Sequence, residues 1–123
     1  MALNVKNTDT AAVSILTGLT TLSSVCDSSG ANSVVAAPAA GYHHVLCAFQ
    51  LIFKEAPATL QVALLKSSTT EMWNFSSTKI DDGIYIEFAP GMELHWGSAQ
   101  AIVINLAEAK DVAYVLRYKT IAD

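Results

Sequence analysis

The chain has 123 residues, of which 52% are hydrophobic and only 15% are charged, and its net charge is −4. This length suits one domain, and the scattered basic residues form neither a stripe for nucleic-acid phosphates nor a cluster for anionic lipid. We expect no membrane helix and no signal peptide, because every apolar run is short and no charged N-terminal region precedes one. A surface so poor in charge predicts an oligomer whose subunits bury apolar area against one another.

The N-terminal part of the chain is weakly patterned. We expect residues 1–18 to form an N-terminal arm or a first edge strand in front of a single domain over residues 19–123. One or two strands are expected within residues 11–26, and a short one near Val34. The tract 20–33 is rich in Ser, Asp, Gly and Asn, which favour turns, and it predicts a loop between the early strands.

A long strand is the clearest element of the middle region. Residues 36–41 contain proline and glycine and predict a connector. Over residues 42–53 the side chains alternate between two largely apolar faces, which is typical of a central strand covered on both sides. Residues 54–57 predict a turn, so the next strand, over residues 59–66, is expected to form a hairpin with the first. One predicted face of the long strand comprises His43, Val45, Cys47, Phe49, Leu51 and Phe53.

The second half of the chain predicts further short strands. Turns are indicated by residues 81–83 and 89–91. A helix over residues 101–111 is the alternative at one place, but the β-branched residues 102–104 favour a strand that ends at Leu106. The expected strands cover residues 70–75, 84–88, 99–106 and 112–120, with a brief one around residues 94–96. Together these elements predict an all-β antiparallel β-sandwich, jelly-roll-like, with about eight strands.

The residue types that commonly bind metals predict no metal site. Cys26 and Cys47 fit neither a redox pair nor half of a zinc site, and we expect two free buried thiols, with a disulfide as the alternative. His43 and His44 are neighbours in a strand, so their rings point to opposite faces and cannot chelate one ion together. His95 could approach either ring, but no cysteine or carboxylate stands at ligand spacing nearby.

The carboxylates do not predict an enzyme. Asp81, Asp82, Glu87 and Glu93 could supply the acid pair of a glycoside hydrolase, but adjacent aspartates before a glycine more often form a turn. Ser98 follows a glycine without the second glycine of a nucleophile elbow, and no glycine-rich phosphate loop occurs. We therefore expect no catalytic residue and no cofactor.

Aromatic side chains are the remaining candidates for a binding surface. Tyr42, Trp73, Tyr85 and Trp96 could form a platform for a sugar or a partner protein, since rigid aromatic area binds at low entropic cost. The alternative is that most of them pack in the core. Of the two adjacent histidines we expect one ring to be packed and the other to lie at a surface or subunit contact, with His44 included among the interface candidates.

From Pro38 onward, several segments and their order along the chain resemble those of a known group of proteins. Residues 39–41 lead into the long apolar strand, residues 59–66 are followed by two serines, and the end of the chain has a strand closing in Asn-Leu, a short turn and a strand with tyrosine and basic residues. In these features the chain resembles small phage virion structural proteins of the capsid-decoration and head-fibre type. The resemblance implies a jelly-roll-like sandwich, a closing hairpin of residues 102–106 with 112–119, and a homotrimer on the capsid.

We therefore predict a non-enzymatic virion structural protein, a capsid decoration or stabilising module that acts through subunit contacts. Its expected partners are further copies of itself, with a trimer favoured, and capsid or other virion proteins, but neither nucleic acid nor membrane. Such a protein is made in the host cytoplasm and ends in the virion. The alternative is a carbohydrate- or receptor-binding β-sandwich of a tail or fibre. The sequence leaves the oligomeric state, the partner surface and the path of the N-terminal segment open.

Overall fold

The computed structural model describes residues 18–123, and this part of the chain forms β-strands and no helix. These residues therefore contain no helix that is long and apolar enough to cross a membrane. The predicted arm falls on residues 1–18 and lies, apart from Gly18, outside the described residues. The strands are β1 (Thr20–Cys26), β2 (Gly30–Val35), β3 (Tyr42–Phe53), β4 (Gln61–Ser67), β5 (Thr70–Ser77), β6 (Gly83–Glu87), β7 (Leu94–His95), β8 (Ile102–Leu106) and β9 (Val112–Ala122).

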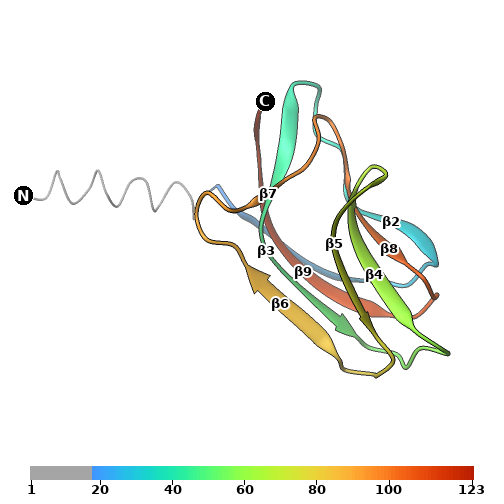
Figure 1. Cartoon of the computed structure of the whole chain (residues 1–123). Helices are drawn as coiled ribbons and strands as arrows, with labels where there is room; N and C mark the ends of the chain where they lie inside the picture. Colours follow the sequence, from blue (N-terminus) through green and yellow to red (C-terminus); the bar gives the residue numbers. More distant parts are fainter. Residues whose placement is uncertain (1–17) are drawn as a thin grey trace, which may run out of the picture.

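The strands make two antiparallel sheets that pack face to face (Figure 1). The five-stranded sheet has the order β1-β9-β3-β6, with β7 also paired to β3, and the four-stranded sheet has the order β2-β8-β4-β5. Every connection crosses from one sheet to the other except β4 to β5 and β6 to β7. Without the short β7, each sheet has four strands, and two four-stranded sheets connected in this order form a jelly roll. The predicted all-β antiparallel sandwich is confirmed.

Two predicted hairpins are wrong. β3 and β4 lie in different sheets, and so do β8 and β9, which the resemblance implied would close the chain as a pair. β3 pairs instead with β6, β7 and β9, while β8 pairs with β2 and β4. Residues 54–60 and 107–111 are long enough to span the roughly 10 Å between packed sheets, so adjacency in sequence did not enforce pairing. The strand that ends at Leu106, predicted in preference to a helix, is confirmed, and the chain bends over residues 107–109.

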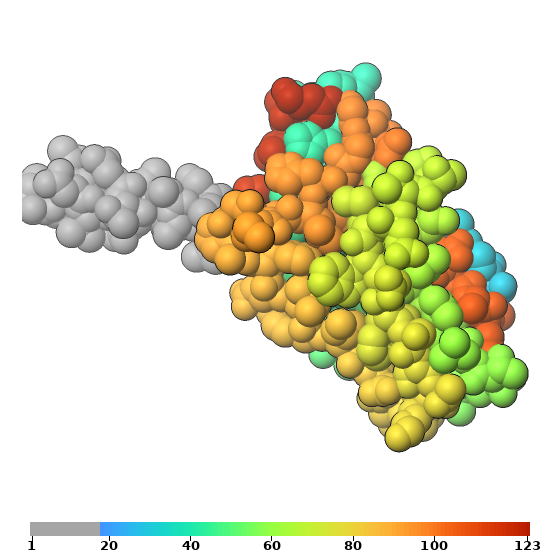
Figure 2. Space-filling model, viewed as in Figure 1, coloured from blue at the N-terminus to red at the C-terminus, as the bar shows by residue number. Residues whose placement is uncertain are grey.

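The core lies between the sheets, where each strand buries alternate residues; in β4 the buried face is that of Gln61, Ala63 and Leu65 and not the more apolar face of Leu60, Val62 and Leu64. In β4 the burial alternates strictly, so that Ala63 and Leu65 are fully buried while Leu64 is half-buried. The side chains of β5 and of the β6 region lie next to one another on the face that Figure 2 shows. There Trp73 packs edge-to-face on Phe88, with 6.0 Å between the ring centroids. The main core side chains are Leu46, Phe49, Leu51, Phe53, Leu65, Ile102, Ile104, Leu106, Val112, Tyr114 and Leu116.

A β-bulge at Cys47 reverses the faces of β3 part-way along the strand. Leu46 lies opposite Tyr118 of β9 and Ala48 lies opposite Arg117, so Cys47 has no partner residue. Before the bulge the even-numbered residues His44 and Leu46 point inward, and after it the odd-numbered residues from Phe49 to Phe53 do so. The predicted single face is therefore wrong over its first half, because a bulge shifts the period-two pattern by one residue.

The predicted loop over residues 20–33 is also wrong, since most of it is β1 and β2 and only residues 27–29 turn between them. β1 pairs with β9 along its whole length, and this ladder overrides the weak strand propensity of Ser and Thr. Asn32 stabilises the turn: its amide nitrogen donates to the carbonyls of Ser28, at 2.8 Å, and of Ile104, at 3.1 Å. The sequence thus predicted correctly that this tract contains a turn, but the turn is shorter than the predicted loop.

Candidate functional site

The outer face of the five-stranded sheet contains two cross-strand rows of uncharged side chains. Register places Val25, Ala113, Ile52 and Gly83 side by side, and Ser23, Val115, Gln50 and Tyr85 in the next row. Val25 is 52% exposed and Tyr85 is 55% exposed at opposite margins of this surface. We call these eight residues the uncharged face. A broad apolar surface of this kind is more typical of a contact between proteins than of a monomer's exterior.

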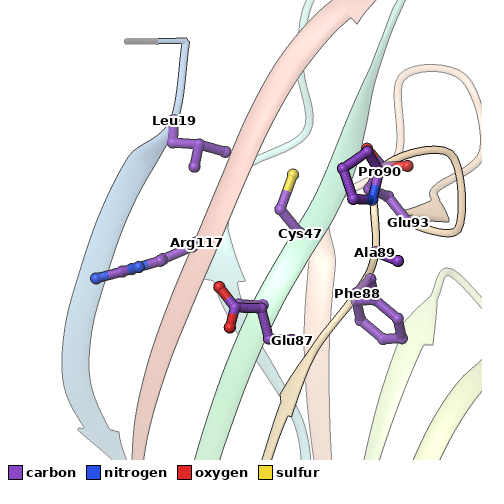
Figure 3. A pocket seen from close by; sticks show the side chains of 9 residues that line it. Leu19, Cys47, Glu87, Phe88, Ala89, Pro90, Glu93 and Arg117 are labelled. Carbon is purple, nitrogen blue, oxygen red and sulfur yellow. The ribbon is translucent and has the colours of Figure 1, made fainter. Parts of the chain in front are cut away.

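A hollow of about 390 Å³ adjoins the uncharged face at the bulge (Figure 3). The bulge turns Cys47 toward this hollow, and the segment after β6 forms one wall with Ala89 and Pro90. Its charged members are Glu87, Glu93 and Arg117, which come from three different segments of the chain. A smaller hollow of about 170 Å³ continues from it toward Tyr85.

Neither cysteine is an activated nucleophile. Both thiols are free, as predicted, but only Cys26 is fully buried, whereas Cys47 is half-buried. Burial raises the pKa of Cys26 to about 11 and also raises the pKa of Cys47, so both remain protonated thiols at neutral pH.

Two histidines meet at the end of the sandwich where β3 begins. Val45 of β3 lies opposite His95 of β7, so His43, two positions earlier on the same outer face, is the diagonal neighbour of His95. His43 Nε2 lies 3.0 Å from His95 Nδ1, and His43 Nδ1 lies 2.8 Å from Asp123 Oδ1. The hydroxyl of Ser98 donates to the second carboxylate oxygen of Asp123.

These contacts lower the pKa of Asp123. The hydroxyl of Ser98 contributes most to the shift and the hydrogen bond with His43 contributes next. The ionised carboxylate therefore accepts the Nδ1–H of His43, which leaves Nε2 of a neutral His43 ring as an acceptor. The tautomer follows from the hydrogen bonds, and in the neutral pair His95 donates its Nδ1–H to His43.

His44 has a different environment from His43. Its ring is buried, with Nδ1 2.8 Å from the hydroxyl of Thr120 and Nε2 2.8 Å from the carbonyl of Ala36. The expectation that one ring is packed while the other lies at the surface thus describes this pair, with His44 as the packed ring. His44 offers no surface to a partner.

The four aromatic residues predicted as a platform do not come together. Trp96 is 3% exposed and its indole Nε1 donates to the carbonyl of Lys66, so it belongs to the core. Trp73 is half-buried against Phe49 and Phe88. Tyr42, at the start of β3, and Tyr85, on β6, are exposed but stand at different places on the five-stranded sheet.

Two of the four candidate carboxylates, Asp81 and Asp82, have structural partners. Asp81 adopts a positive φ of 63°, its N–H donates to the carbonyl of Phe53, and its side chain lies 3.4 Å from Lys54. Asp82 accepts a hydrogen bond from the hydroxyl of Ser77. These two residues form the turn that connects β5 to β6, as the sequence indicated.

Sequence reasoning missed Asp123 and Arg117, and it considered Ser98 only as a nucleophile. No local pattern marks their positions, because the register of β9 and the position of β7 bring them to the outer face. Comparison with known proteins adds no assignment, since no family model matches the chain and no curated protein matches it either.

Proposed function

We propose that this chain is a non-enzymatic virion structural protein that decorates or stabilises a capsid through contacts between subunits. The observation that supports the proposal is the uncharged face, which extends across all four main strands of one sheet without a charged residue. A contact over such a face buries apolar area without desolvating charges, and burial of apolar area is the main favourable term in association.

The jelly roll is a second support. Viral capsid and lectin domains both use this architecture, so the fold is compatible with the virion role by analogy alone. The resemblance to small phage virion proteins, made from the sequence, favours a homotrimer. Several weak apolar contacts formed at the same time would then bind the module by avidity.

The uncharged face is tested by a matched pair of substitutions. Val115 and Val103 are half-buried valines on the second strand of their respective sheets, and they point to opposite outer faces. In size-exclusion chromatography with light scattering we expect wild type and Val103→Arg to be oligomeric at micromolar concentration and Val115→Arg to be monomeric. A strictly monomeric wild type, or an unchanged Val115→Arg oligomer, would contradict the proposal.

The capsid role requires a separate measurement. We expect wild type and Val103→Arg to cosediment with capsids prepared without this protein, and Val115→Arg to remain in the supernatant. An oligomer that never cosediments would retain the subunit contact and refute the decoration role.

A carbohydrate- or receptor-binding role is the second candidate, and one observation favours it. The exposed ring of Tyr85 borders the hollow of about 170 Å³, whose lining includes Gln50 and Arg117, groups that commonly bind sugar hydroxyls. A glycan array on wild type and Tyr85→Ala tests this role. Tryptophan fluorescence would be a poor reporter, because Trp96 is buried and Trp73 packs against core rings.

A further inference from the structure

The rings of His43 and His95 face each other through one nitrogen each. Their facing nitrogens are 3.0 Å apart and their ring centroids are 5.3 Å apart, so the two nitrogens point almost directly at one another. With Zn–N bonds of about 2.0–2.1 Å and a tetrahedral angle, two imidazole nitrogens on one zinc stand about 3.3 Å apart. An ion can therefore replace the shared proton once the nitrogens separate slightly and each ring turns its facing nitrogen toward the ion.

The surroundings of His43 match those of a metal-binding histidine. Such a ring usually donates its second N–H to a carboxylate, which fixes the tautomer and makes the free nitrogen a better ligand. Asp123 accepts from His43 Nδ1 at 2.8 Å, and Ser98 in turn orients the carboxylate. The nitrogen that faces His95 is the free one.

Among residues 18–123, three charged side chains lie near the pair on the same outer face. Asp123 contacts His43, Glu93 interacts electrostatically with both His95 and Lys119, and Lys119 lies opposite Val45 on β9. The two carboxylates outweigh the single ammonium group, so the local charge favours a cation.

We propose that His43 and His95 bind a divalent first-row transition-metal ion through His43 Nε2 and His95 Nδ1. In the bound form His95 carries its proton on Nε2, the nitrogen outside the pair. Among the described residues no group of three or more His, Cys, Asp or Glu side chains forms a complete ligand set, so the remaining positions go to water. Imidazole ligands suit Zn²⁺, Cu²⁺ and Ni²⁺, and the proposal is independent of the virion role.

Zn²⁺ is the probe for the test, and His44 supplies an internal control because its ring is adjacent in sequence but buried on the opposite face. In titrations of the full chain at pH 7.5 we expect saturable binding of one ion, followed by calorimetry. Histidine ring NMR is expected to show shifts of His43 and His95 while the ring signals of His44 stay in place. Chelator is expected to reverse both effects.

Graded variants separate ligands from supporting groups. His43→Gln and His95→Gln are each expected to abolish saturable binding, whereas Asp123→Asn, which keeps an acceptor for His43 Nδ1–H, is expected to weaken it by about tenfold. Unchanged binding in both glutamine variants, or no saturable binding by folded wild type, would overturn the proposal. Circular dichroism of each variant confirms that the comparison is between folded proteins.

Discussion

At both ends of the sandwich, buried polar side chains and carboxylates join segments that are far apart in the sequence, but the groups that surround them differ. At the end where β3 finishes, Gln61 accepts from the N–H of Glu108 and donates to its carbonyl, both at 2.9 Å. The side chain of Glu108 accepts from the backbone N–H groups of Ala58, Thr59 and Leu60 and from the Thr59 hydroxyl. These contacts join the β3–β4 and β8–β9 connections.

At the other end, where β3 begins, side chains replace backbone donors. His44 joins Thr120 to Ala36, and Asp123 is held by His43 and Ser98. Glu108 is held mainly by backbone N–H groups, and at the same end Glu55 accepts from the N–H of Asp111. Asp123 is held by an imidazole and a hydroxyl group. Distant segments are therefore joined mainly through the backbone at one end and through side chains at the other.

The largest predicted effect is at the Glu108 end. Gln61 is 1% exposed, and its replacement in Gln61→Leu leaves the N–H and carbonyl of Glu108 and the N–H of Val62 without their side-chain partner. We expect the free energy of unfolding to fall by about 3 kcal/mol, measured by urea denaturation. Gln50→Leu, on the outer face, is the control and should change it by less than about 0.5 kcal/mol. If Gln61→Leu and Gln50→Leu lowered the free energy of unfolding equally, the buried hydrogen bonds of Gln61 would not be what stabilises this end.

A smaller loss is expected from the corresponding change at the His43 end. His44→Phe keeps a ring of similar size but leaves the carbonyl of Ala36 and the hydroxyl of Thr120 without their partner. Because two bonds are lost and the Thr120 hydroxyl can turn to water, we expect a loss of about 1–2 kcal/mol in the same urea experiment. A loss larger than that of Gln61→Leu would reverse the order of the two ends.

The smallest predicted effect is the difference between Glu108 and Asp123 in how the stability that they contribute changes with pH. Backbone hydrogen bonds from Thr59 and Ala58 lower the pKa of Glu108, and Ser98 and His43 lower that of Asp123. A lowered folded pKa stabilises the protein above the unfolded value of about 4 and the gain is lost as pH falls through the folded pKa. We expect both Glu108→Gln and Asp123→Asn to flatten the loss of stability on acidification from about pH 6 to about pH 3.

The steeper change should come from Glu108, because it accepts more hydrogen bonds than Asp123 does. Thermal unfolding followed over this pH range measures the slopes. If Glu108→Gln retained the slope of the wild type, the carboxylate would not be the acid-sensitive group at that end.

Part of the candidate site was predictable from local patterns. The aspartates of the 81–83 turn and the strand that carries Tyr85 follow from neighbouring residues, and the spacing of the two cysteines favoured free thiols. The burial of Trp96 and His44 did not, since an aromatic ring or imidazole in a strand can occupy either face, and the bulge at Cys47 inverted the expected pattern of β3.

The sequence by itself determined that residues 18–123 form strands and no helix, where most of the turns fall and which residues of β6 and β9 face inward, because these properties depend on side-chain period and local backbone preference. Only the tertiary structure decided that β3 and β4, like β8 and β9, belong to different sheets, and that His43 meets His95 and Asp123. Strand pairing depends on contacts between residues that are far apart in the sequence. Apolar strands of similar length are nearly interchangeable as partners, so no local pattern could specify which strands pair.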